Sequence, residues 1–151
     1  MSAKDKKLIM VTIAVVLIAA VLILLDNSTF LVKRTNEFEL PEDAEIVAVN
    51  KHGFIAFRMA YEAKIKVDHD DPWATVELLE NSCPVQGEVI PYDNFMTTAE
   101  ELFAGYKLVP APEEESNVWI GAYTDIDDHE YVYILDSEGP EDAYLYIYYT
   151  R

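Results

Sequence analysis

The longest apolar stretch of the chain is LIMVTIAVVLIAAVLILL, at residues 8–25, which contains no charged side chain. An α-helix of this length measures about 27 Å, close to the roughly 30 Å of the hydrocarbon core of a bilayer. The run is longer than the apolar region of a cleaved signal peptide, typically about 7–15 residues, and no small residues of a cleavage site follow it. Residues 8–25 therefore predict an uncleaved N-terminal transmembrane helix. A signal peptide and a buried helix are the alternatives.

The charges on either side of this run predict its orientation. Three lysines precede it, whereas Asp26 follows it directly. Because lysine and arginine are enriched on the cytoplasmic side of membrane helices, residues 1–7 are predicted to be a cytoplasmic tail. Lys33 and Arg34 count against this orientation. Residues 26–44 are polar with scattered apolar positions, and they predict a stalk that leads to a folded extracytoplasmic domain at residues 45–151.

Further along, the apolar positions alternate. From Ile55 to Val67 every second residue is apolar, and the residues between them include Glu62 and Lys64. A period of two predicts a long strand with one buried face. The preceding NKHG, residues 50–53, ends in glycine between two apolar runs and predicts the turn of a hairpin.

Two segments in the middle of the chain have helical spacing instead. Residues 71–82 begin with Asp71 and Pro72, which suit the start of a helix, and continue with apolar residues three positions apart. Residues 97–108 begin with a threonine and a glutamate in the spacing of a capping box. The segment between them, residues 83–95, contains two prolines and a glycine and predicts a loop.

The last part of the chain returns to alternation. Strands are predicted at residues 117–124, 130–136 and 143–150, with acidic turns between them. Together with the earlier elements this gives the order β-β-α-α-β-β-β after the N-terminal helix. That order predicts an α+β domain with a mostly antiparallel sheet, packed on one or two helices that cover one face.

Tyrosine is concentrated in these last strands, where seven of the ten tyrosines lie between residues 123 and 149. Alternation is expected to place the aliphatic side chains on one face of the sheet and the aromatic ones on the other. Tyrosine combines a large contact area with a hydroxyl and is enriched at interfaces, so the aromatic face predicts a partner-binding surface. Alternatively, the tyrosines stabilise the sheet, and the stalk or the strand at 54–67 covers them. The predicted partner-binding residues are Trp119, Tyr123, Tyr131, Tyr133, Tyr144, Tyr146 and Tyr148.

The charge of the chain narrows the choice of partner. Residues 26–151 contain 27 of the 28 acids and 8 of the 11 lysines and arginines, a formal charge of −19. A field of this sign repels nucleic acid and anionic lipid headgroups and attracts basic proteins and cations. A basic protein partner is therefore expected, and nucleic acid is not. The alternative is that the acidity reflects a saline habitat.

One acidic turn, within GAYTDIDDHEYVYILD at residues 121–136, was the strongest candidate for a metal site. With Asp125 as its first position, Glu130 stands where an EF-hand loop requires glycine, and the residues that follow favour a strand over a helix. Aspartates in turns commonly bond nearby backbone amides, so a hairpin turn is predicted and no metal site. The weak metal candidates are Asp125, Asp127, Asp128 and Glu130.

No motif of catalysis or cofactor binding is present in the sequence. No serine stands in a G-x-S-x-G motif, and the five glycines are not clustered into a nucleotide-binding loop. Cys83, the single cysteine, excludes an internal disulfide and lacks activating neighbours. No catalytic residue, cofactor or nucleotide ligand is therefore predicted.

These patterns predict a single-pass protein of the cell membrane, held in the lipid bilayer by residues 8–25. Its extracytoplasmic domain is expected to bind a basic protein without catalysing a reaction. An immunity or inhibitor protein and an accessory subunit of an envelope complex both fit this description. The alternatives are a cation-binding sensor domain that uses the acidic turns, and a hydrolase acting on cell-wall polymers.

Overall fold

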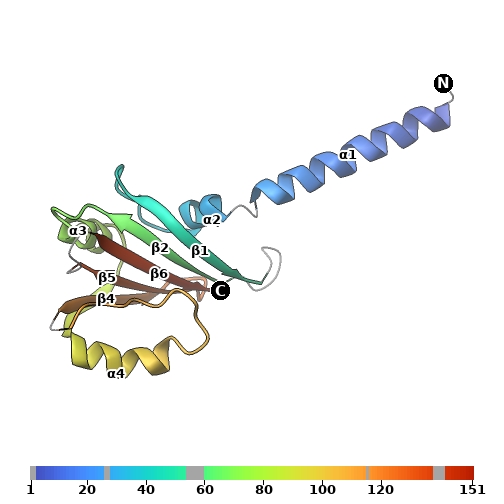
Figure 1. The fold of residues 1–151 in the computed structure, drawn as a ribbon. Coiled ribbons are helices and arrows are strands. Elements are labelled where there is room, and N and C mark those ends of the chain that lie inside the picture. Colours follow the sequence, from blue (N-terminus) through green and yellow to red (C-terminus); the bar gives the residue numbers. More distant parts are fainter. Residues whose placement is uncertain (1–2, 26–27, 54–59, 115, 138–141) are drawn as a thin grey trace.

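The computed structural model describes residues 3–25, 28–53, 60–114, 116–137 and 142–151 (Figure 1). Within these residues the chain forms helices on both sides of a single sheet. The elements are, in chain order, α1 (Ala3–Leu25), α2 (Ser28–Thr35), β1 (Glu45–His52), β2 (Ala60–Val67), α3 (Trp73–Ser82), β3 (Gln86–Pro91), α4 (Tyr92–Leu102), β4 (Asn117–Thr124), β5 (Glu130–Asp136) and β6 (Ala143–Thr150).

The described strands belong to one antiparallel sheet with the order β1-β2-β6-β5-β4-β3. Its centre joins strands that are far apart in sequence, because β2 pairs with β6, with Tyr61 opposite Tyr149. The predicted α+β class with an antiparallel sheet is confirmed. The three strands predicted in the last part of the chain are also confirmed, with the bounds now seen for β4, β5 and β6.

The predicted order of helices and strands is wrong in two places, because two short elements lack a strong pattern. β3 lies in the predicted loop 83–95; it is only six residues long, and at the edge of the sheet it buries little. α2 lies in the predicted stalk 26–44. A helix of two turns is not stable by itself, and α2 is held by its buried Leu31 and Val32.

α4 begins earlier than the sequence predicts. It starts at Tyr92, directly after Pro91, and not at Thr97. The Thr97 hydroxyl donates a hydrogen bond to the Asp93 carbonyl at 2.9 Å, inside the helix. The predicted capping box is therefore wrong. Of the long strand predicted over residues 54–67, the structure contains β2, and residues 54–59 lie outside the described part of the chain.

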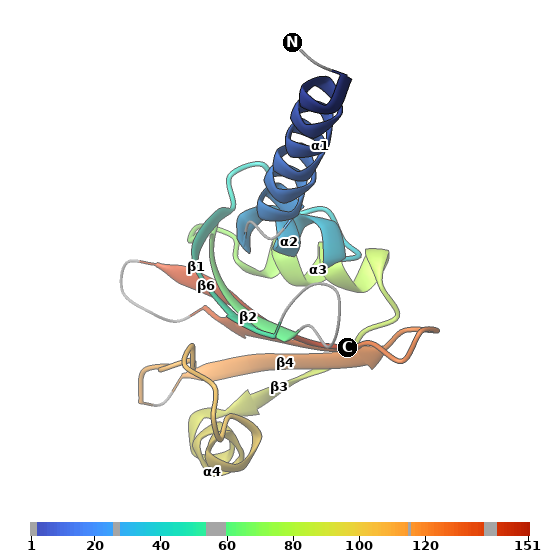
Figure 2. The same cartoon turned by 90° about the vertical axis from the view of Figure 1, so that its right-hand side faces the viewer.

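Helices cover both faces of the sheet, whereas one covered face was predicted. Figure 2 shows α2 and α3 on one side of the sheet and α4 on the other. We call these sides the α3 face and the α4 face. The prediction failed because the central strands are apolar on both sides: in β5, for example, Tyr133, Ile134 and Leu135 are all fully buried.

The α3 face carries the larger core. Here Val76 and Leu79 of α3 and Leu31 and Val32 of α2 pack on the sheet. The sheet contributes aromatic and aliphatic side chains from four strands: Tyr61, Ala63, Ile65, Val67, Trp119, Tyr123, Tyr131, Tyr133, Leu135, Ala143, Leu145, Ile147 and Tyr149.

Trp119 is accommodated on the α3 face by two glycines. Gly87 of β3 lies opposite Gly121 of β4 in the ladder, and a Cβ atom added to either would overlap the indole ring of Trp119. The ring therefore lies against bare backbone, and Trp119 is buried. The pair of glycines is required by this close approach.

The α4 face carries a second, smaller core. Phe95 and Ala99 of α4, and Phe103 directly after it, pack against the sheet. The buried sheet residues beneath them are Val118, Ile134, Tyr146 and Tyr148. α4 covers only part of this face, which leaves an open region beside β3 that is described below.

α1 extends away from the sheet (Figure 1). Its described side chains are exposed all around the helix, from Ile9 to Val21, and Met10 is 71 % exposed. The helix predicted over residues 8–25 is present within α1. Among the described residues, however, no helix is both long and apolar enough to qualify as a membrane span.

Candidate functional site

The predicted partner-binding tyrosines do not share one face of the sheet. Trp119, Tyr123, Tyr131 and Tyr133 lie together on the α3 face, as predicted for β4 and β5. Those of β6 lie on the opposite, α4 face, because the register places Val132 opposite Tyr148 and Tyr131 opposite Tyr149. A shift of one residue in register moves every side chain of a strand to the other face. The pairing of β6 with β2 and β5 fixes this register, and the sequence pattern does not.

These aromatic residues are also core residues. Tyr144 is half-buried, and the other six predicted residues, Trp119, Tyr123, Tyr131, Tyr133, Tyr146 and Tyr148, are buried. The surface that they were predicted to form is covered by α2 and α3 on one side and by α4 on the other. Their large contact areas therefore contribute to packing within the chain.

The hydroxyls of the tyrosines on the α3 face hold the end of α2 and the residues that follow it. Tyr133 donates a hydrogen bond to Asn36 Oδ1 at 3.0 Å, and Tyr131 donates to the Thr35 carbonyl at 3.1 Å. Tyr123 donates to Glu37 Oε2 at 3.0 Å. Three consecutive residues of the predicted stalk are thereby bound to the sheet.

Burial raises the pKa of these hydroxyls above that of a free tyrosine. On the α4 face, burial raises the pKa of Tyr146 to about 12. The hydroxyls are therefore protonated at neutral pH, and each can act as a donor. This fits the direction of the bonds to the carbonyl and carboxylate acceptors of the 35–37 segment.

The acidic turn between β4 and β5 is a hairpin turn, as predicted. Asp125 Oδ1 accepts hydrogen bonds from the backbone N–H groups of Asp127 and His129 at 2.8 and 2.9 Å, and Oδ2 lies 2.7 Å from His129 Nδ1. Burial alone would raise the pKa of Asp125, but these hydrogen bonds outweigh it and hold the pKa below its ordinary value. Asp128 has a positive φ of 61°, which suits an aspartate in a tight turn.

The structure does not bring the four weak metal candidates together as ligands. The Asp125 carboxylate is used by the turn itself, and Asp127 and Asp128 are exposed. Among the described residues, no cluster of three or more histidine, cysteine, aspartate or glutamate side chains could hold a metal ion.

A polar pocket of about 490 Å³ lies beside this turn, between the end of α2 and the end of the sheet. It carries both signs of charge, with Arg34 and Arg151 on its wall together with Glu37, Asp125 and Asp127. No pattern in the sequence indicates this pocket, since its wall comes from three segments that are distant along the chain. Because two arginines and three carboxylates share its wall, the pocket is not strongly selective for a ligand of either sign.

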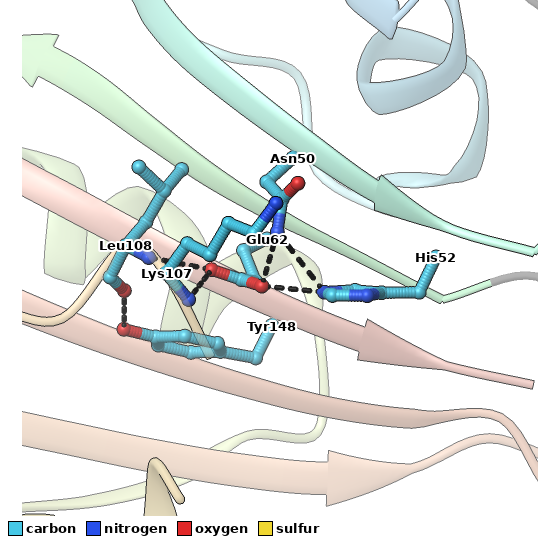
Figure 3. A network of polar contacts seen from close by, with 6 residues as sticks. All are labelled: Asn50, His52, Glu62, Lys107, Leu108 and Tyr148. Carbon is cyan, nitrogen blue, oxygen red and sulfur yellow. Dashed lines mark hydrogen bonds and ion pairs between the residues drawn. The ribbon is translucent and has the colours of Figure 1, made fainter. Parts of the chain in front are cut away.

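A buried carboxylate on the α4 face was missed by the sequence analysis. Glu62 lies in the middle of β2 and is fully buried, although alternation assigned it to the exposed side of that strand. Figure 3 shows that donors surround its carboxylate. Oε2 accepts from the backbone N–H groups of Lys107 and Leu108 at 2.7 and 2.6 Å, and Oε1 lies 2.7 Å from Asn50 Nδ2 and 2.5 Å from His52 Nε2.

This network joins the edge strand β1 to the segment that follows α4. Residues 107 and 108 follow α4, while Asn50 and His52 belong to the edge strand β1. Tyr148 adds a further bond by donating to the Leu108 carbonyl at 2.5 Å. Burial by itself would raise the pKa of Glu62, but the hydrogen bonds from Leu108, His52, Asn50 and Lys107 outweigh it, so the pKa lies below its ordinary value.

The paired carboxylate and imidazole of Glu62 and His52 have the chemistry of an acid–base dyad. However, each oxygen of Glu62 already accepts two hydrogen bonds, and the carboxylate is inaccessible to solvent. A carboxylate that is saturated in this way positions its partners and is not free to take a proton from a substrate. The arrangement is therefore suited to fixing the segment after α4 on the sheet.

The α4 face is open beside β3. A shallow groove of about 400 Å³ runs along this part of the sheet. Its floor is apolar, with Ile120 and Val132 half-buried and Ala122 exposed, and Leu102 at the end of α4 forms one side. Glu88 of β3 lines the same groove. This groove is a largely apolar concave surface bordered by the edge strand β3.

The charges are divided unevenly between the two halves of the sheet. Residues 68–142, which provide α3, β3, α4, β4 and β5, contain 20 of the 28 acids and a single basic residue, Lys107. Residues 28–67 and 143–151, which provide α2, β1, β2 and β6, contain six acids and seven basic residues. The segment that supplies β5, β4 and β3, called the acidic half below, therefore carries essentially the whole net charge of the domain.

Comparison of the chain with protein-family models, with curated proteins and with solved structures finds no match.

Proposed function

We propose that this protein is a membrane-anchored binding protein whose folded domain holds a basic protein partner and catalyses no reaction. The single observation that carries the proposal is the uneven distribution of charge. A net charge of this size on one half of a small domain creates a strong, directed field, which speeds the encounter with a positively charged partner and selects against acidic ones.

The anchor is the apolar run at residues 8–25. This run contains no charged residue, and as a helix it is about as long as the hydrocarbon core of a bilayer is thick. The lysines before it favour a cytoplasmic N-terminus. We propose that the domain after it lies outside the cytoplasm. A basic toxin or enzyme that reaches the membrane from outside, or a basic subunit of an envelope complex, would meet the acidic half of the domain there.

The contact surface of this proposal differs from the one that the sequence predicted. The tyrosines are packed in the two cores, so they stabilise the domain that presents the charges. Exposed carboxylates are available instead, among them Glu88 beside the groove and Glu101 near the end of α4. We therefore assign the binding of the partner to the acidic half of the surface.

The proposal is tested with the full chain, reconstituted in nanodiscs of neutral lipid and used to capture proteins from a membrane and envelope extract of the source cells. The expected result is a specific partner with a basic isoelectric point whose affinity falls as salt is added, because exposed charge pairs are screened over about 10 Å at 0.1 M salt. Capture of no protein, or of an acidic partner insensitive to salt, would contradict the proposal.

A matched pair of variants separates the acidic half from general acidity. Glu88→Gln with Glu101→Gln removes two exposed charges from the acidic half, and Glu39→Gln with Glu42→Gln removes two from the segment before β1. Both pairs change the net charge equally. We expect the first pair to weaken binding of the captured partner by about tenfold and the second to leave it within about twofold, measured by interferometry at fixed salt.

A further inference from the structure

We propose that the partner binds as an extended strand that pairs with the outer edge of β3, and that this strand alternates basic with apolar residues. The inference rests on the proposed function, because it specifies how the basic partner engages the acidic half of the domain. Strand addition to an exposed sheet edge is a common mode of peptide recognition, in which backbone hydrogen bonds supply affinity and alternate side chains supply specificity.

The two edges of the sheet differ in how they are protected. β1 carries an irregularity in its register between Ile46 and Ala48, and a lysine, Lys51, near its end. Bulges and lysines are features that keep an edge strand from pairing with other chains. β1 also contacts α2. These features make β1 a poor template for an added strand.

β3 contacts α4, but it has neither an irregular register nor a lysine. It pairs with β4 in an unbroken antiparallel register from Gln86 to Pro91, and its residues are exposed or half-buried. The strand contains no lysine, and its only proline is the last residue. Alternate N–H and C=O groups between Gln86 and Ile90 therefore point away from the sheet.

The groove beside β3 suits the side chains of such a strand. An added strand would lie about 4.8 Å from β3, so every second side chain would lie on the α4 face next to Gln86 and Glu88. Long side chains there can lean over β3 toward Ile120 and Ala122 on the floor of the groove. Leu102, which is 49 % exposed, forms the apolar side of the groove.

The charges around the groove specify a basic strand. Glu88 lies on the α4 face opposite Ile120, and Glu130 lies on the same face, two residues before Val132. Both glutamates are exposed, and no lysine or arginine lies among the groove residues. The long apolar stems of lysine and arginine can cover the floor while their charged ends meet these carboxylates.

The same charges disfavour a second copy of this chain as the occupant. Two β3 strands paired about a two-fold axis would bring Glu88 of both copies to the same seam, and the acidic halves of the two domains would face each other. Like charges placed opposite each other across a strand pair are destabilising. The occupant is therefore a segment of a different, basic protein.

The probe for this inference is a peptide of about ten residues in which lysine alternates with valine, labelled with a fluorophore. Its control is the same peptide with every second backbone nitrogen methylated, which keeps the charges and removes the donors on one edge. With the full chain in neutral nanodiscs, we expect the unmethylated peptide to bind at least about tenfold more tightly by fluorescence anisotropy. Equal affinities would overturn the inference, because binding would then depend on charge alone.

Hydrogen–deuterium exchange locates the site. On binding of the peptide, amides of residues 86–90 should become protected, while those of β1 should be unchanged. Protection confined to β1 or to another surface would overturn the inference. Dimers of the chain in the absence of peptide, joined through β3, would also overturn it and are detected by mass photometry.

Two variants separate this inference from the proposed function. Ala122→Arg places a positive charge on the groove floor and should weaken binding of the captured partner by more than about tenfold. Glu77→Arg, at an exposed position of α3 away from the groove, makes a larger change of charge and should weaken binding less. If a basic partner is captured but tolerates Ala122→Arg, strand addition at β3 is wrong and the proposed function stands. If no basic partner is captured, the proposed function is wrong.

Discussion

On the α3 face of the sheet, the polar atoms are carried by tyrosines, whereas on the α4 face a buried carboxylate is the centre of the polar contacts. The tyrosines on the α3 face bury large rings and extend their hydroxyls to residues 35–37. Glu62 on the α4 face contributes little apolar area but binds both the neighbouring strand β1 and the segment after α4. Each arrangement attaches a connecting segment to the sheet, in one case mainly by packing and in the other mainly by charge-assisted hydrogen bonds.

Because of this difference, the stability of each face depends on a different kind of interaction. Loss of a buried ring leaves a cavity, whose cost scales with its volume and is the same at every pH. Loss of a buried carboxylate leaves donors without an acceptor, and its contribution depends on the ionisation of that one group. The two faces should therefore respond differently to substitution and to acid.

The largest effect is expected on the α3 face, at Tyr133. Its side chain is fully buried, packs edge-on against Phe38 and donates to Asn36. Tyr133→Ala should lower the free energy of unfolding by about 3–5 kcal/mol, measured by urea denaturation. Tyr133→Phe keeps the ring and removes one hydrogen bond, so it should cost about 1 kcal/mol. Equal losses for the two variants would mean that the hydroxyl and not the ring carries the stability.

An intermediate effect is expected on the α4 face, at Glu62. Glu62→Gln places an amide N–H₂ group against donors and removes the charge. The variant should therefore have a free energy of unfolding lower by about 2–4 kcal/mol at neutral pH, measured by urea denaturation. Glu101→Gln, on the exposed side of α4, is the control and should change the free energy by less than about 0.5 kcal/mol.

The pH dependence of this variant sharpens the contrast between the faces. The pKa of Glu62 is lower in the folded chain than its ordinary value of 4.5, so its stabilising contribution is complete above that pH and is lost as the pH falls toward the folded pKa. The difference in free energy of unfolding between the wild-type chain and Glu62→Gln should therefore narrow below pH 4.5. The corresponding difference for Tyr133→Ala should not narrow. A gap for Glu62→Gln that is constant from neutral to acidic pH would contradict this role of the charge.

The smallest effects on stability are expected at two neighbouring positions of β4 whose side chains lie on opposite faces of the sheet. Gly121→Ala adds a methyl group against the Trp119 ring on the α3 face and should cost about 1–2 kcal/mol. Ala122→Val adds two methyl groups to the open groove on the α4 face and should change stability by less than about 0.5 kcal/mol. Similar losses at both positions would show that the groove is not open in solution.

The sequence predicted the last three strands with their bounds because alternation there is strong and the turns between them are rich in aspartate, glycine and proline. It also predicted a hairpin turn at the acidic run between β4 and β5, since aspartates in turns commonly bond nearby backbone amides, as Asp125 does here. These are local properties, decided within a few residues of chain. β3 and α2 were missed because each is short and owes its stability to what it packs against.

The placement of the tyrosines and of Glu62 was decided by tertiary structure. Alternation states which residues of a strand share a face, but the pairing of β6 with both β2 and β5 decides which face that is. Likewise, Glu62 sits at a polar position of its strand, and only the return of residues 107 and 108 across the sheet buries it.

By itself, the sequence determined the last three strands, the α+β class and the concentration of acids in residues 68–142, because each depends on composition and on neighbours along the chain. The tertiary structure decided that the segment with these acids supplies the adjacent strands β5, β4 and β3, that the tyrosines fill two cores, and that β3 is an edge strand. These properties depend on strand order and register, which are set by contacts between residues far apart in sequence and by the burial that such contacts produce.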